Sequence, residues 1–283
     1  MALTWQLRRQ RLDLTRRGLI MGVVNVTPDS FFDGGQYESA DAAVAHGLGL
    51  IDQGADILDI GGESTRPGAA PVAAGEQMRR VLPVIGRLRE STDALLSIDT
   101  ASAEVAYAGV VAGADIINDV TGLRGDAAMA AVAAESRAGV IIMHMQGDPR
   151  TMQANPVYGD VVAEVREFFC QQLAVAQEAG ISREALVFDP GIGFGKNLEH
   201  NLALLRRLEA LAPEADRPLL LGVSRKSFIG RAIDSEAMAD RFWPTVALTS
   251  FAREKGARVF RVHEVLPNVQ ALRMTEAILF AGE

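Results

Sequence analysis

Short apolar, β-branched runs recur along the chain between longer stretches of helical character, and this alternation limits the fold more than any other feature. Each run is too short for a helix, and most are continuously apolar, as expected of strands that are buried on both faces. Strands that alternate with helices pair in parallel through right-handed crossovers. The eight runs span residues 18–26, 55–62, 94–100, 115–120, 140–145, 186–191, 219–224 and 259–263.

Several of the intervening stretches have the periodicity and end signals of helices. We expect helices over residues 39–55, 76–90, 161–180, 244–257 and 266–282. Eight strand–helix units favour a closed (β/α)₈ TIM barrel, with an open doubly wound sheet as the competing arrangement. The eight runs are alike and none has the polar character of an edge strand, which favours closure. We therefore predict one barrel domain over residues 1–283, with long βα loops after the first and second strands.

Composition excludes several classes of function. The chain has 28 Lys and Arg residues against 36 Asp and Glu residues, a net charge of −8, which opposes general binding to nucleic acid or to anionic membranes. The single cysteine, Cys170, excludes an internal disulfide and a cysteine-based metal site. No apolar run is long enough to span a membrane, and the first residues lack the apolar core of a signal peptide. We expect a cytoplasmic protein.

Polar side chains stand at the end of nearly every predicted strand, where a barrel places its active site. Helix capping explains a single Asp or Asn, but it does not explain Lys226, Arg261 and His263. The acceptors suit a ligand that presents several N–H groups, and they are Asp59, Asp99, Asn118 and Asp189. The donors suit an anion, and they are Arg66, Ser224, Lys226, Arg261 and His263. The pattern predicts a ligand with a guanidine-like edge and a phosphate tail.

Apolar side chains near the same strand ends could flank a flat ring, namely Met143, Met145, Phe194 and Phe228. The glycine-rich segment GIGFGK (191–196) superficially resembles a phosphate loop, but Pro190 and Asn197 break that motif. The sequence contains neither a zinc signature nor the elbow motif of a serine nucleophile.

Eight segments together resemble the dihydropteroate synthases of the folate pathway, and they occur in that family's order. They are GVVNVTPDSFFDGG (22–35), GGESTRPGA (61–69), SIDT (97–100), INDV (117–120), MHMQGDPRTMQ (143–153), DPGIGFGK (189–196), SRKSFIG (224–230) and RVHEV (261–265). The resemblance implies a TIM barrel that joins (7,8-dihydropterin-6-yl)methyl diphosphate to 4-aminobenzoate, with help from Mg²⁺. It also implies a homodimer.

The same resemblance implies roles for the residues at the matching positions. The pterin would be held by Asp99, Asn118, Met143, Asp189, Lys226 and Arg261. The diphosphate would be held by Asn25, Thr65, Arg261 and His263, with Asn25 also at the Mg²⁺. The 4-aminobenzoate pocket would comprise Thr65, Arg66, Pro67, Phe194, Ser224 and Lys226. The catalytic set would be Asp99, Lys226, Arg261 and His263.

Two other functions are compatible with a pterin-binding barrel. The methyltetrahydrofolate-dependent methyltransferases grip a pterin in a similar way, but they have no use for STRPG (64–68), SRKSF (224–228) and RVH (261–263). A non-catalytic pterin-binding paralogue could lose Asn25, Asp99, Lys226 or Arg261 without losing its fold, but all four are present here. One departure from the family's pattern is Glu264, which stands where the family usually has Asp.

Overall fold

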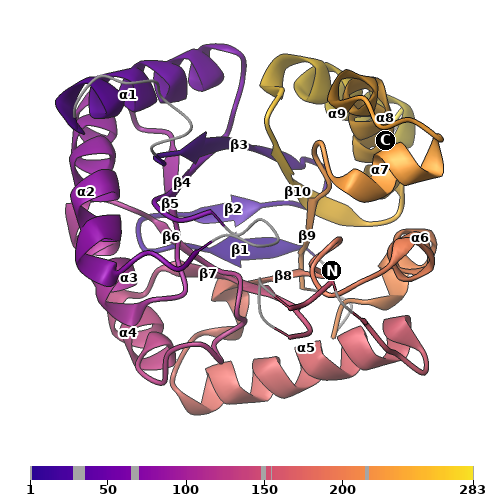
Figure 1. The fold of residues 1–283 in the computed structure, drawn as a ribbon, viewed down its shortest axis with the longest axis horizontal. Helices are drawn as coiled ribbons and strands as arrows, with labels where there is room; N and C mark the ends of the chain where they lie inside the picture. The colour runs from indigo at the N-terminus through magenta and orange to yellow at the C-terminus, as the bar shows by residue number, and fades with distance from the viewer. Residues whose placement is uncertain are drawn as a thin grey trace.

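Eight parallel strands close into a barrel, and helices surround it (Figure 1). The computed structural model describes residues 2–27, 36–64, 70–147, 151–153, 155–213 and 217–282, with the backbone alone for 36–39. The barrel strands, in chain order, are β3 (Leu19–Asn25), β4 (Ile57–Gly61), β5 (Leu95–Asp99), β6 (Ile116–Asp119), β7 (Gly139–Met143), β8 (Leu186–Asp189), β9 (Leu219–Gly222) and β10 (Ala257–Val262). Because β10 pairs with β3, the sheet has no free edge, which confirms the closed barrel and excludes the open sheet.

Helices follow the strands in turn. They are α1 (Gln36–Asp52), α2 (Ala74–Ser91), α3 (Ala103–Ala112), α4 (Met129–Ser136), α5 (Val161–Glu178), α6 (Leu198–Arg206), α7 (Ser227–Ala232), α8 (Phe242–Glu254) and α9 (Val265–Leu279). Short 3₁₀ turns are η1 (Arg183–Ala185), η2 (Leu208–Ala210) and η3 (Met238–Arg241). The five predicted helices correspond to α1, α2, α5, α8 and α9. The long connections after β3 and β4 fall partly outside the described residues.

The barrel interior changes from apolar to polar along its axis. Side chains on each strand alternate outward and inward, and outward ones such as Ile20, Leu58 and Ile98 pack against the helices. The inward side chains at the strand starts form an apolar layer of Leu19, Ile57, Leu95, Ile116, Ile141, Val187, Leu220 and Val259. Two residues further along each strand, the inward positions are mostly polar, so the carboxyl ends of the strands surround a polar rim.

An N-terminal hairpin, which the sequence reasoning did not predict, closes the other end of the barrel. Strands β1 (Thr4–Gln6) and β2 (Arg11–Asp13) pair antiparallel and lie across the barrel in Figure 1. Trp5, Leu7 and Leu14 are buried against the apolar layer of the strand starts. The indole Nε1 of Trp5 donates a hydrogen bond to the Ala185 carbonyl at 2.8 Å. The hairpin therefore completes the core that the strands alone leave open.

A buried ion pair ties the chain's two ends together beside this hairpin. Arg253 of α8 and Glu276 of α9 are both buried, and Arg253 Nε lies 2.8 Å from Glu276 Oε1. The same oxygen accepts a hydrogen bond from the Gly18 amide just before β3. Within the described part of the chain, no helix is both long enough and apolar enough to cross a membrane.

Candidate active site

Three predicted site residues lie at the same level of the rim, on four neighbouring strands. Asn25 of β3 is in register with Gly61 of β4, Gly61 with Asp99 of β5, and Asp99 with Asn118 of β6. Arg261 of β10 reaches this group, and its NH2 atom lies 2.8 Å from Asp99 Oδ2. Residues that are up to 236 positions apart in the sequence thus meet at one edge, because parallel barrel strands all end there.

Asp59 serves the protein rather than a ligand, contrary to the expectation that its oxygens face the substrate. Its side chain is fully buried one layer below Asp99. Asp59 Oδ2 accepts a hydrogen bond from Arg261 Nε at 2.6 Å, and both carboxylate oxygens accept from Asn118 Nδ2 at 3.2 and 3.3 Å. Asp59 therefore fixes two of the predicted pterin-binding side chains, and it is a site residue that the sequence reasoning placed in the wrong role.

Asp99 lies in an environment that raises its pKa. Burial raises the pKa of this carboxyl group to about 7, and the nearby negative charge of Asp59 adds to the effect. The Arg261 guanidinium opposes both, because its positive charge favours the ionised carboxylate. Near neutral pH, the negative charge at this position is therefore sensitive to what binds beside it.

The opposite side of the rim is built from β8 and β9. The Asp189 side chain accepts a hydrogen bond from the Gly191 amide at 2.8 Å, and burial raises its pKa. A Cβ atom added to Gly222 would lie 3.7 Å from Arg261 Cβ and 3.8 Å from Asp189 Oδ2. The absence of a side chain at Gly222 thus leaves Arg261 and Asp189 facing the same space.

Lys226 and Phe194 form a cation–π pair next to Asp189. Lys226 Nζ lies 4.4 Å from the centre of the Phe194 ring and donates a hydrogen bond to the Ile192 carbonyl. Burial lowers the pKa of Lys226 to about 8, although the Asp189 carboxylate opposes this decrease. The two residues predicted for the arylamine pocket are therefore in contact with each other.

Ser224 and His263 meet at the ends of the neighbouring strands β9 and β10. The His263 amide donates to Ser224 Oγ at 3.2 Å, and His263 Nδ1 lies 2.9 Å from the same oxygen. This contact fixes the orientation of the imidazole ring. It also brings together a residue expected at the diphosphate and one expected at the arylamine.

Methionine side chains supply an apolar wall. Met143 of β7 is in register with Asp189 of β8, and it packs in a cluster with Met145, Met152, Val120 and Phe194. The expectation that Phe228 flanks a ring is wrong. Phe228, the second residue of α7, is buried in the core between the strands and the helices.

The remaining predicted residues concern the anion and the metal. Thr65, Arg66 and Pro67 lie outside the described residues. Asn25 is half-buried at the end of β3. Within the described ranges, no group of three or more His, Cys, Asp or Glu residues is arranged to hold a metal ion.

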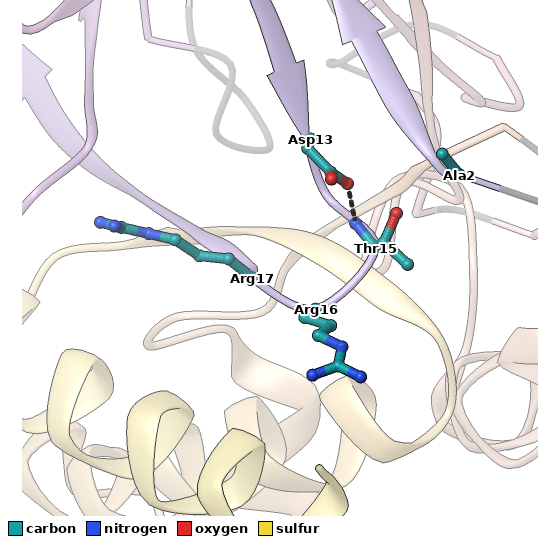
Figure 2. Close-up of a pocket in the computed structure, with 5 residues that line it drawn as sticks. All are labelled: Ala2, Asp13, Thr15, Arg16 and Arg17. Atoms are coloured by element: carbon teal, nitrogen blue, oxygen red, sulfur yellow. Dashed lines mark hydrogen bonds between the residues drawn. The ribbon is translucent and has the colours of Figure 1, made fainter. Parts of the chain in front are cut away.

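Two surface pockets lie outside the polar rim. One of about 450 Å³ borders it, where Arg225 donates to Glu264 and Trp243 forms part of the wall. The other, of about 550 Å³, lies beside the N-terminal hairpin (Figure 2). Figure 2 shows its Arg16 and Arg17 side chains pointing in different directions, so they do not converge on one ligand.

Comparisons with known proteins agree with this geometry. The family model of pterin binding enzymes matches residues 21–263. A dihydropteroate synthase of Escherichia coli K12 is 46% identical over 264 residues, which cover 93% of each chain. A Xanthomonas albilineans dihydropteroate synthase solved with 4-aminobenzoic acid has a TM-score of 0.91 and 44% identity, covering 99% of this chain and 100% of that one.

A second structure from that organism, in complex with 7,8-dihydropteroate, has a TM-score of 0.87 and 42% identity. It covers 98% of this chain and 99% of its own. The likeness thus extends over the whole barrel and includes every strand end that carries a described site residue. The chain belongs to the pterin binding enzyme family and, within it, to the dihydropteroate synthases.

Proposed function

We propose that the protein condenses (7,8-dihydropterin-6-yl)methyl diphosphate with 4-aminobenzoate, which gives 7,8-dihydropteroate and diphosphate. The observation that carries this proposal is the rim itself, where acidic and amide acceptors stand beside cations. The acceptors Asp99, Asn118 and Asp189 suit the N–H groups of an aminopyrimidinone ring. Arg261 and His263 lie at the end of one strand and suit a diphosphate.

The reaction breaks a C–O bond and forms a C–N bond. The diphosphate leaves with the bonding electron pair, and Arg261 and His263 stabilise its negative charge. The positive charge left on the methylene carbon is delocalised into the pterin, where the Asp99 carboxylate stabilises it. The arylamine nitrogen then adds to this carbon and loses a proton to solvent. This path needs no covalent bond to the protein.

In this mechanism Asp99 acts through the negative charge of its carboxylate, and an uncharged side chain of the same shape cannot replace it. We expect Asp99→Asn to lower kcat by about 10²–10³-fold, because an amide cannot stabilise the developing cation. Binding of the pterin should change much less, since the amide keeps a hydrogen-bond acceptor. Equal losses in kcat and in pterin affinity would contradict a role in the transition state.

The donor set at Asn25 fits Mg²⁺, although Asn25 supplies only one ligand. Its side-chain amide oxygen is a hard donor, and Mg²⁺ usually takes one or two protein ligands together with phosphate oxygens and water. Bound there, Mg²⁺ would neutralise charge on the leaving diphosphate. Removal of divalent ions with a chelator should abolish turnover, and added Mg²⁺ should restore it.

Exposed apolar side chains on the packed helices α8 and α9 support a homodimer. Trp243, Met274 and Ile278 are 71%, 61% and 66% exposed, and Phe251 lies on the same pair of packed helices. Contiguous exposed apolar patches commonly mark protein interfaces. Ile278→Asp should therefore shift the mass measured by light scattering from that of a dimer to that of a monomer, and an unchanged mass would exclude this face.

The direct test of function mixes the protein with the pterin diphosphate, 4-aminobenzoate and Mg²⁺ and measures diphosphate release. Release that requires the arylamine supports a synthase. Pterin binding without release would instead identify a non-catalytic paralogue. Methyl transfer from methyltetrahydrofolate, with no use of 4-aminobenzoate, would identify a methyltransferase.

A further inference from the structure

Three of the seven residues in the loop 190–196, between β8 and α6, are glycines. Gly191, Gly193 and Gly195 all have positive φ angles, of 61°, 84° and 63°, which other residues rarely adopt. A Cβ atom at Gly191 or Gly195 would collide with the carbonyl oxygens of His144 and Gln146. The loop, residues 190–196, therefore lies directly against the backbone that follows β7, and the buried side chains of Ile192 and Lys196 help to hold it there.

Lys196, at the end of this loop, folds back beneath it. Its side chain is 2% exposed, and its Nζ donates to the Phe194 carbonyl at 2.9 Å and to the Gly191 carbonyl at 3.1 Å. The same atom lies 2.9 Å from His144 Nδ1. The three N–H groups of an ammonium thus have acceptors on the loop and on the segment after β7.

The chemistry of His144 matches this geometry. Burial lowers the pKa of His144 to about 2, so the imidazole is neutral and its Nδ1 can accept a hydrogen bond. Burial also lowers the pKa of Lys196 well below that of an exposed lysine. The lysine of a phosphate loop points outward to its ligand, whereas Lys196 points inward to backbone carbonyls.

The other face of the loop belongs to the candidate active site. Lys226 Nζ binds the Ile192 carbonyl and covers the Phe194 ring, so the loop lies between two lysines. Lys196 donates a hydrogen bond to the Phe194 carbonyl, and the Phe194 ring contacts Lys226. A shift of the loop would therefore displace both the Phe194 ring and the Lys226 ammonium.

We infer that Lys196 is a positioning residue that fixes the loop 190–196, so that Phe194 and Lys226 form a preformed wall for the arylamine substrate. This inference rests on the proposed function, because it assigns the wall to 4-aminobenzoate. Lys196 contacts the wall only through the backbone of the loop. Among the side chains proposed to hold the pterin ring, Asp99 and Asn118 are bonded elsewhere, whereas Asp189 and Lys226 are bonded to the loop.

This difference predicts a separation of the two substrates. We expect Lys196→Met, which keeps the length of the side chain and removes its donors, to raise KM for 4-aminobenzoate by about 10–100-fold, since small misplacements of a positioned group have large effects. The dissociation constant for the pterin diphosphate should rise less than KM for 4-aminobenzoate, because Asp99 and Asn118 share no partner with Lys196, although Asp189 accepts a hydrogen bond from the Gly191 amide of the loop. A lysine with only a structural role would lower stability without this separation.

Two further variants complete the experiment. Lys255→Met is the matched control, because Lys255 pairs with Glu209 on the surface and should leave both constants unchanged. Tyr158→Phe removes only the hydroxyl that donates to the Gly195 carbonyl at 2.9 Å, and so loosens the same loop without emptying a buried site. We expect it to raise KM for 4-aminobenzoate by about two- to tenfold, the effect of one hydrogen bond.

Circular dichroism melting would show which variants fold. If Lys196→Met does not fold, Tyr158→Phe decides alone. An unchanged KM for 4-aminobenzoate in the folded variants would overturn the inference, as would equal weakening of both substrates. A wild-type protein that releases no diphosphate would refute the proposed function, whereas an active wild type with unaffected variants would refute only the role of Lys196.

Discussion

The substitution Asp59→Asn tests whether Asp59, which is bonded to protein groups, controls the ionisation of Asp99, which we propose contacts the pterin. The negative charge of Asp59 raises the pKa of Asp99. The substitution removes this charge and keeps the size of the side chain. Two carboxylates on one guanidinium are roughly 5 Å apart, where like charges repel by about 3 kcal/mol at an effective dielectric constant near 20. At about 1.4 kcal/mol for each pKa unit, the variant should lower the pKa of Asp99 by roughly two units.

The assay is the pH dependence of kcat/KM for the pterin diphosphate, which reports ionisation in the free enzyme. The wild type should lose activity as the pH falls through about 7, because protonation removes the Asp99 charge. In Asp59→Asn this loss should occur about two pH units lower. The plateau at high pH should also fall, by roughly 10²-fold, because Arg261 loses one of its two carboxylates.

Asp56→Asn is the control, because it removes the same charge at the other end of the barrel, where Asp56 pairs with Arg17. Its pH profile should match that of the wild type. If the loss of kcat/KM at low pH occurs at the same pH in Asp59→Asn as in the wild type, or at a higher pH, the electrostatic coupling between Asp59 and Asp99 is refuted. If this loss of activity shifts by the same pH in Asp59→Asn and Asp56→Asn, the shift reflects the net charge of the protein alone.

Three further results follow from the structure. Trp5→Ala should lower the free energy of unfolding in urea by about 3–5 kcal/mol, because it empties the end of the core, and leave both KM values unchanged. Glu276→Gln should cost roughly 3–5 kcal/mol in the same assay, because it leaves Arg253 buried without a carboxylate. KM for 4-aminobenzoate should rise as the pH increases through about 8, where Lys226 loses its positive charge, and a flat profile would contradict this role.

The strands could be predicted from the sequence because burial on both faces leaves a continuous apolar signal. Helix α3 could not, since its exposed side includes Tyr107 and Val111 and the helix has no clear polar face. The short helices α6 and α7 offer too few turns for a periodic pattern. The strands of the N-terminal hairpin span three residues each and are largely polar, so only the packing of Trp5 in three dimensions reveals them.

The site could be predicted as far as its location, because all the barrel strands end at one rim. Depth along a strand could not be predicted. Asp59 and Asp99 look alike in sequence, but Asp59 lies two residues before the Gly61 position that aligns with Asp99, and there protein donors occupy it. The direction of Lys196 was equally hidden, since a glycine-rich loop with a lysine does not say whether the ammonium faces a ligand or the backbone.

The hairpin at the bottom of the barrel also has a consequence for how the chain is made. Trp5 leaves the ribosome before the residues that it contacts, because these include Ala185, and the apolar layer beneath it includes Leu220 of β9 and Val259 of β10. At about 5–20 residues per second, translation takes roughly ten seconds or more to supply them. During that interval the Trp5 indole lacks its packing partners, so the emergence of β10 determines when the hairpin can pack against the barrel.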